Sequence, residues 1–155
     1  MKVEICVTSV DAAKIAEAAG ADRLELCSEL AVGGVTPSAG LLEAIRDTVA
    51  IPVHVLIRPR SGNFAYSEPT LTQMLRDISY CRKLGFDGIV TGCLLSDNRL
   101  DRVGMESLVE ACGDLHLTFH RAFDRIPDWE AALSDLEVLG IDTILTSGQA
   151  ASALQ

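Results

Sequence analysis

Hydrophobic residues along the chain form short runs that alternate with segments of helical periodicity. Six apolar and β-branched runs predict strands at residues 3–8, 23–27, 53–58, 88–93, 116–120 and 143–147. Between these runs, apolar residues recur every three or four positions, which predicts five amphipathic helices. Strict alternation of strand and helix predicts a parallel sheet with crossover helices.

A repeated turn supports this alternation. The tripeptides Gly20-Ala21-Asp22, Gly85-Phe86-Asp87 and Gly140-Ile141-Asp142 each lie between a predicted helix and the next strand. Glycine is expected where a helix ends in the left-handed conformation, so one βα unit is repeated along the chain. The second helix is predicted to begin with Thr36 as its N-cap and Pro37 in its first turn.

Polar and apolar residues alternate within the predicted strands. The polar positions are Glu4, Cys6, Glu25, Cys27, His54, Arg58, Thr118 and His120, and Ile5, Leu24, Val55 and Phe119 are among the apolar positions between them. In a doubly wound sheet, helices cover both faces and strand residues are apolar on both sides. A polar face directed into a barrel explains the alternation better. We therefore predict an α/β fold of the TIM-type (β/α)8 barrel class.

The predicted barrel is incomplete. A (β/α)8 barrel has eight βα units and typically about 250 residues. The chain has 155 residues and about six strands and five helices. We expect residues 1–155 to form a single (β/α) barrel domain that is truncated before the last βα units, with a naturally short barrel as the alternative. The open sheet edges of an incomplete barrel favour a homo-oligomer.

Composition narrows the classes of partner. The formal net charge of −9 argues against a nucleic-acid backbone or an anionic membrane surface as a partner. The first residues do not form a signal-peptide hydrophobic region, and no run reaches the ~18 apolar residues of a membrane span. The five cysteines are scattered and form no Cys-x-x-Cys pair. These features predict a cytoplasmic protein with reduced thiols.

Polar residues gather at the predicted carboxyl ends of the strands, where barrels of this class carry their functional groups. The candidate ligand-binding residues are Glu4, Glu25, Arg58, Arg60, His120 and Arg121. Arginine side chains suit a carboxylate or phosphate group, and His120 with Glu25 is a candidate acid–base pair. One hypothesis is therefore an enzyme, of unknown reaction, that acts on a small anionic metabolite. A salt-bridge network that fills the barrel interior is the structural alternative.

Two cysteines occupy equivalent places in the first two strands, within Glu4-Ile5-Cys6 and Glu25-Leu26-Cys27. If these strands are adjacent and parallel, both thiols point into the barrel. Thiolates are ligands that soft Cu(I) prefers, so Cys6 and Cys27 are candidate metal ligands. Free cysteines are also common as small buried hydrophobic residues, and this alternative stays open.

Five segments carry a family resemblance. Residues 23–27, 33–38, 57–60, 119–124 and 145–148 resemble successive signatures of the CutC family, in family order. The resemblance implies a TIM-type barrel, a cytoplasmic protein and a role in copper homeostasis with Cu(I) binding. Cys6 and Cys27 match the cysteines discussed as copper ligands in that family. The last two βα units expected of the family are absent. Two hypotheses follow: Cu(I) binding or trafficking, and an enzyme of small anionic metabolites.

Overall fold

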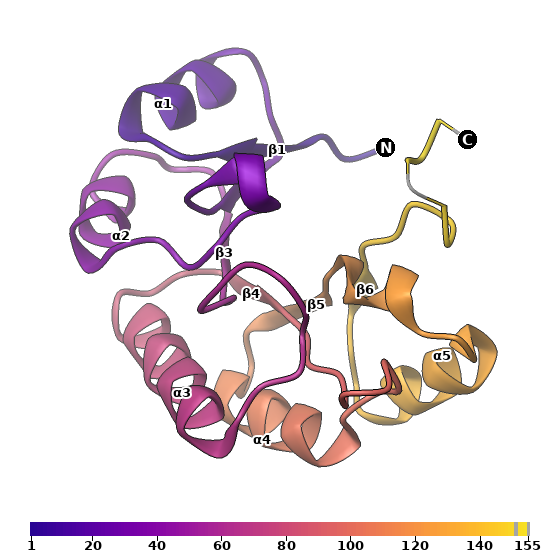
Figure 1. Ribbon diagram of the computed structural model, residues 1–155. Helices are drawn as coiled ribbons and strands as arrows, with labels where there is room; N and C mark the ends of the chain where they lie inside the picture. Colours follow the sequence, from indigo (N-terminus) through magenta and orange to yellow (C-terminus); the bar gives the residue numbers. More distant parts are fainter. Residues whose placement is uncertain (151, 155) are drawn as a thin grey trace.

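Six parallel strands pair in the order of the chain in the computed structural model, which describes residues 1–150 and 152–154. The strands are β1 (Glu4–Val7), β2 (Arg23–Leu26), β3 (Val53–Leu56), β4 (Gly88–Thr91), β5 (His116–Phe119) and β6 (Thr143–Ile144). Figure 1 shows the sheet curving while helices cover its outer side. The α/β class and the incomplete barrel predicted from the sequence are confirmed.

Within the described residues, five α-helices connect the strands, and two short 3-10 helices lie in the loops. They are α1 (Val10–Ala18), η1 (Leu30–Val32), α2 (Ala39–Arg46), α3 (Glu68–Lys83), α4 (Arg102–Cys112), η2 (Arg121–Arg125) and α5 (Trp129–Val138). None of the helices in the described part of the chain is long and apolar enough to cross a membrane.

The start of α2 differs from the prediction. Ser38 is the N-cap, and its side chain accepts a hydrogen bond from the backbone N–H of Leu41 at 3.2 Å. Thr36 has another role, because its hydroxyl oxygen accepts a hydrogen bond from the backbone N–H of Arg58 at 2.9 Å. The prediction of Thr36 as the cap was therefore wrong. This hydroxyl fastens the loop after β2 to the end of β3.

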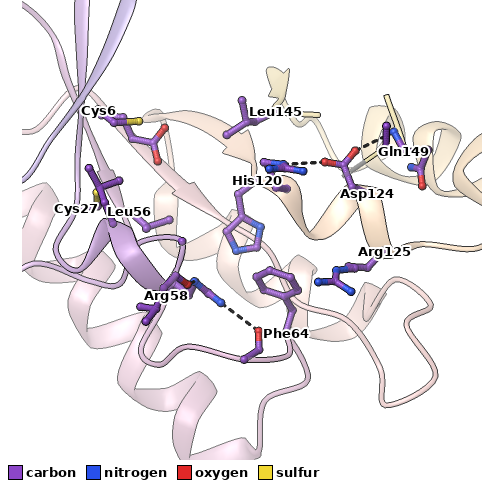
Figure 2. Close-up of a pocket in the computed structure, with 17 residues that line it drawn as sticks. Cys6, Cys27, Leu56, Arg58, Phe64, His120, Asp124, Arg125, Leu145 and Gln149 are labelled. Atoms are coloured by element: carbon purple, nitrogen blue, oxygen red, sulfur yellow. Dashed lines mark hydrogen bonds and ion pairs between the residues drawn. The ribbon is translucent and has the colours of Figure 1, made fainter. Parts of the chain in front are cut away.

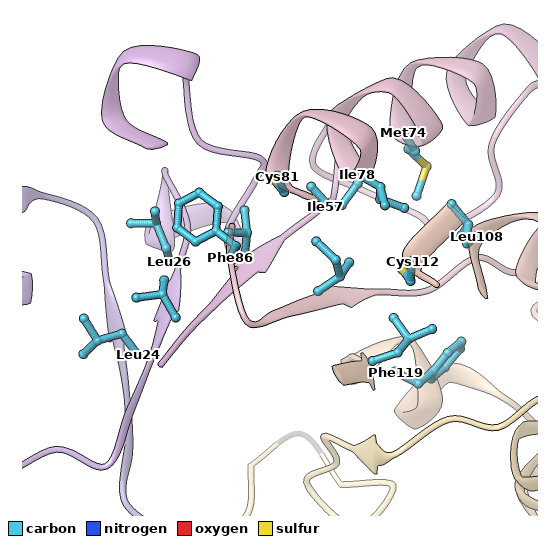
Figure 3. Packing of buried hydrophobic residues seen from close by; sticks show 14 of the residues in the cluster. Leu24, Leu26, Ile57, Met74, Ile78, Cys81, Phe86, Leu108, Cys112 and Phe119 are labelled. Carbon is cyan, nitrogen blue, oxygen red and sulfur yellow. The ribbon is translucent and has the colours of Figure 1, made fainter. Parts of the chain in front are cut away.

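The main hydrophobic core lies between the outer face of the sheet and the helices. Leu24 and Phe119 on the strands are fully buried in the same core cluster as Met74, Ile78 and Leu108 on the helices. Figure 3 shows these side chains between the strands and the flanking helices. A separate small cluster of Cys27, Leu56 and Val90 lies on the opposite, inner face. The predicted alternation of inner and outer residues is thus confirmed in the middle of the sheet.

The two edges of the sheet are less well covered. Ile5 on the outer face of β1 is 39% exposed, and Ile15 on α1 is 69% exposed. At the other edge, Trp129 and Leu133 on α5 are each 42% exposed, although helical periodicity predicts them on a buried stripe. The prediction that Ile5 faces a helix therefore holds only in part, because β1 is an edge strand and α1 covers one side of it.

Two glycines on the inner face of β4 and its continuation make room for histidines from neighbouring strands. A Cβ atom at Gly88 would lie 2.6 Å from the ring of His54, and one at Gly92 would lie 2.8 Å from Nδ1 of His120. Such distances are too short for real side chains. The absence of a side chain at these positions lets both imidazole rings cross β4 inside the barrel.

Candidate ligand-binding cavity

A cavity of about 660 Å³ opens at the carboxyl end of the sheet, where this class of barrel carries its ligands. Figure 2 shows side chains from the first strands and from the loops after β3 and β5 surrounding it. Its lining residues are Cys6, Glu25, Cys27, Leu30, Val32, Gly33, Leu56, Arg58, Gly62, Phe64, His120, Arg121, Asp124, Arg125, Leu145, Gln149 and Ala150. This volume and the mixed lining suit a small molecule or an ion.

Cys6, Glu25 and Cys27 form one wall of the cavity. Cys6 lies opposite Glu25 in the pairing of β1 with β2, and Cys27 follows two residues later on the same face. Partial burial and then the nearby Glu25 carboxylate raise the pKa of Cys6 to about 12, and the same two causes raise that of Cys27 to about 11. Burial and then the charge of Glu4 raise the pKa of Glu25 to about 7. This wall therefore holds two protonated thiols near neutral pH.

His120 forms the middle of the cavity and is only 5% exposed. Its Nδ1 atom accepts a hydrogen bond from the backbone N–H of Ala122 at 3.3 Å, so the ring proton resides on Nε2. This Nε2 atom is buried and has no hydrogen-bond partner among the described residues. Burial and then the charge of Arg58 lower the pKa of His120 to about 3, so the ring is neutral at physiological pH.

The loop after β3 is held together by its own arginines. Arg58 donates hydrogen bonds to the carbonyl oxygens of Val32, Gly34 and Gly62 at 2.8–3.1 Å, which leaves its Nε–H without a partner. Its guanidinium also lies 5.0 Å from the ring centre of Phe64. Phe64 in turn lies 4.7 Å from the ring of His120, centre to centre. Arg58 thus supports the wall of the cavity and contributes a positive charge to it.

Arg60 belongs to the same loop but faces elsewhere. It donates to the carbonyl oxygens of Asn63 and Ala65 at 3.0 and 2.6 Å, and its guanidinium lies 5.2 Å from the ring centre of Tyr66. Arg60 does not line the cavity. In the structure this arginine therefore stabilises the loop conformation.

Asp124 fastens the loop after β6 to the mouth of the barrel. Its carboxylate accepts hydrogen bonds from the backbone N–H groups of Ser147 and Gln149 at 3.0–3.2 Å and from the guanidinium of Arg121 at 3.0 Å. Burial alone would raise the pKa of Asp124, but hydrogen bonds from Thr146, Ser147 and Arg121 hold it far below its usual range. The backbone donors of this loop are consequently occupied by a carboxylate of the chain itself.

The amino end of the barrel interior, here called the floor, contains a second polar group. Glu4 forms an ion pair with Arg23 across β1 and β2. The rings of His54 and His116 lie 4.8 Å apart, and Nε2 of His116 lies 2.9 Å from the hydroxyl oxygen of Thr143. None of these residues lines the cavity.

Most of the candidate residues named from the sequence meet at the cavity. Cys6, Cys27, Glu25, Arg58, His120 and Arg121 line it, whereas Glu4 lies at the floor and Arg60 within its own loop. Asp124, Arg125 and Gln149 also line the cavity; Asp124 lies within the signature at residues 119–124, whereas Arg125 and Gln149 carry no signal beyond their place a few residues after a strand end.

The fold and the cavity define a (β/α)-barrel protein whose ligand site lies at the carboxyl ends of the strands. A model of the CutC family matches residues 1–155, and the chain belongs to this family. It is 49% identical over 152 residues to a CutC family protein of Yersinia pestis (strain Pestoides F), covering 98% of this chain and 60% of that protein. It is 48% identical over 153 residues to the human copper homeostasis protein cutC homolog, covering 99% of this chain and 56% of that protein.

A solved structure agrees with this assignment. The crystal structure of CutC from Streptococcus agalactiae matches with a TM-score of 0.91 and 37% identity over 97% of this chain and 75% of that one. The chain thus spans about 60% of the length of the curated relatives that it matches.

Proposed function

We propose that this chain is a cytoplasmic copper homeostasis protein that binds Cu(I) through the thiolates of Cys6 and Cys27. The observation that carries the proposal is that both thiols line one cavity from adjacent parallel strands. The name of the human relative, a copper homeostasis protein homolog, points the same way.

The chemistry of the donor set fits Cu(I) better than other metals. No group of three or more histidine, cysteine, aspartate or glutamate side chains within residues 1–150 and 152–154 is arranged to hold a metal ion. Zinc sites in proteins usually need four ligands, or three with a water. Two sulfur donors with few harder ligands are suited to soft Cu(I).

Protonation sets a condition on this binding. The raised pKa values of Cys6 and Cys27 mean that both thiols carry protons at neutral pH. A metal must displace those protons, since the thiolate is the ligand. Cys6 lies on the exposed edge strand and Cys27 is buried, so an incoming ion would reach Cys6 first.

The test is an anaerobic Cu(I) titration of the full chain against a competing chelator. The C6A/C27A double variant should lose about two orders of magnitude in affinity or more, because its cavity retains no sulfur donor. The control is C81A/C112A, which removes two neighbouring thiols that belong to α3 and α4 and lie in the main hydrophobic core, away from the cavity. The control should bind as wild type does. Equal affinity of wild type and C6A/C27A would overturn the two-cysteine site.

A second candidate function, an enzyme acting on a small anionic metabolite, is favoured by a different observation. His120 and the positively charged Arg58 line the same cavity, and each keeps one buried N–H without a partner. These residues are suited to bind an anion, and they do not identify a reaction. Equal Cu(I) affinity of wild type and C6A/C27A would overturn the copper site and leave this candidate standing.

A further inference from the structure

Two residues that line the cavity carry hydrogen-bond donors that nothing in the described chain satisfies. Nε2–H of His120 and Nε–H of Arg58 are both buried without a partner. Leaving such a group unmet destabilises the fold, most of all where the group is charged. A buried donor that lines a cavity therefore indicates that an acceptor binds there.

A third donor lies at the rim. Arg125 lines the cavity from the end of η2, is exposed, and forms no hydrogen bond or ion pair with another described residue. Figure 2 draws it on the side of the cavity where Phe64 and His120 lie. Its guanidinium is thus available to a ligand, whereas Arg58 is largely engaged by carbonyl oxygens.

We infer that the part of the cavity between His120, Arg58 and Arg125 binds a small carboxylate with an apolar body. Two arginine charges and a neutral N–H donor select an anionic oxygen acceptor, and a guanidinium binds both oxygens of a carboxylate at once. The nearby carboxylates do not oppose this binding: Asp124 is engaged by Arg121 and Ser147, and Glu25 lies on the wall with the thiols.

Two observations favour a carboxylate over a phosphate. Phosphate sites typically use several backbone N–H groups, and those of Ser147 and Gln149 are already taken by Asp124. The remaining lining includes Leu30, Val32 and Leu145, which would contact hydrocarbon. The ligand class is therefore a short aliphatic or aromatic carboxylic acid.

This subsite goes beyond Cu(I) binding and does not depend on it. Removing the thiols of Cys6 and Cys27 should leave carboxylate binding intact, because the donors follow the ends of β3 and β5 or lie in η2. Failure of the copper site and failure of the carboxylate site are consequently distinguishable in one set of variants.

The experiment is a titration of the full chain with butyrate, followed by protein-observed NMR, with 1-butanol and inorganic phosphate as comparison probes. Wild type should bind butyrate saturably in the millimolar range and more tightly than either comparison probe. Arg125→Gln should weaken butyrate binding about ten- to a hundredfold, the value of one hydrogen bond to a charged group. Arg76→Gln, which removes an exposed arginine on α3, should change it less than about twofold.

A pair of substitutions at His120 tests the buried donor. His120→Asn keeps an acceptor for the N–H of Ala122 but removes the Nε2–H donor, so butyrate affinity should fall about tenfold or more. His120→Gln places an amide N–H near the position of Nε2 and should retain more of the affinity. If the His120→Asn variant does not fold, Arg125→Gln still tests the inference, because Arg125 is exposed. Absence of saturable butyrate binding, tighter binding of phosphate, or wild-type affinity in Arg125→Gln would overturn the inference.

Discussion

The two ends of the barrel interior contain the same kinds of side chain and use them differently. At the floor, Arg23 pairs with Glu4, and the ring of His54 lies 4.8 Å from that of His116 while its buried Nδ1 has no partner among the described residues. At the mouth, His120 lines a cavity and keeps its buried Nε2 without a partner among the described residues. An unmet buried nitrogen inside a barrel is therefore evidence of a ligand only where its side chain lines a cavity, as that of His120 does and that of His54 does not.

Strand β4 contributes to both ends in the same way. Gly88 makes room for His54 at the floor, and Gly92 makes room for His120 at the mouth. The two glycines lie four residues apart on one face of the chain, since side chains alternate along a strand. They offer a direct way to perturb one end without the other.

The largest expected effects come from filling these two spaces. Gly88→Ala and Gly92→Ala should each lower the free energy of unfolding by about 1–3 kcal/mol, the usual cost of overpacking. Only Gly92→Ala should weaken butyrate binding, because its Cβ would displace the ring of His120. Urea unfolding and butyrate titration measure the two effects.

Gly40→Ala is the control for this pair, since Gly40 lies in α2 and a Cβ there meets nothing within 4 Å. It should not lower stability, because alanine is the better helix former. Equal loss of butyrate binding in Gly88→Ala and Gly92→Ala would erase the distinction between floor and mouth.

The floor should also make the stability of the fold depend on pH. Burial, followed by the charges of Arg23 and His116, lowers the pKa of His54 to about 4 from an ordinary value of 6.5. Between these pH values the unfolded chain binds a proton that the folded chain does not. Stability should therefore fall as the pH is lowered through this window, by up to about 1.4 kcal/mol per pH unit from this residue.

The comparison with His54→Gln isolates this contribution. Glu25, with its pKa raised to about 7, acts in the opposite direction above pH 4.5, but it is present in both proteins. Urea unfolding from pH 7 to 4.5 should give a shallower decline for the variant. Parallel curves for the two proteins would show that His54 is not held neutral at the floor.

The sequence predicts the fold well and the site in part, for a physical reason. Alternation within strands identifies the inner positions of Cys6, Glu25 and His120, because it depends on local geometry alone. It cannot tell that Glu4 is paired at the floor or that Arg60 folds back on its own loop. The role of Asp124 was equally hidden, since its partner Ser147 lies 23 residues away and only the folded chain brings them together.

A substitution in the loop after β3 should have a smaller effect on stability. Arg60→Ala should lower the free energy of unfolding by about 0.5–1.5 kcal/mol, since several hydrogen bonds to loop carbonyls are lost. Butyrate affinity should change less than about threefold, because Arg60 does not line the cavity. A loss of butyrate affinity as large as that of Arg125→Gln would show that Arg60 belongs to the ligand site.

The smallest effect on the cavity should come from the edges of the sheet. Ile5 and Ile15 expose apolar surface beside the unpaired edge of β1, so the chain should self-associate as its concentration rises. Ile15→Glu should reduce this association in sedimentation velocity and leave Cu(I) affinity unchanged, because Ile15 lies on the outer side. Association that is insensitive to Ile15→Glu would place the contact elsewhere.

The central claim is that the thiols at the mouth, and no other group of the chain, hold Cu(I). X-ray absorption spectroscopy of the Cu(I)-loaded full chain tests this claim most directly, because it identifies the elements bound to the metal. We predict a first shell made up of two sulfur atoms in wild type and in C81A/C112A, and loss of this shell in C6A/C27A. A shell dominated by nitrogen or oxygen in wild type, or a sulfur shell that persists in C6A/C27A, would contradict the account.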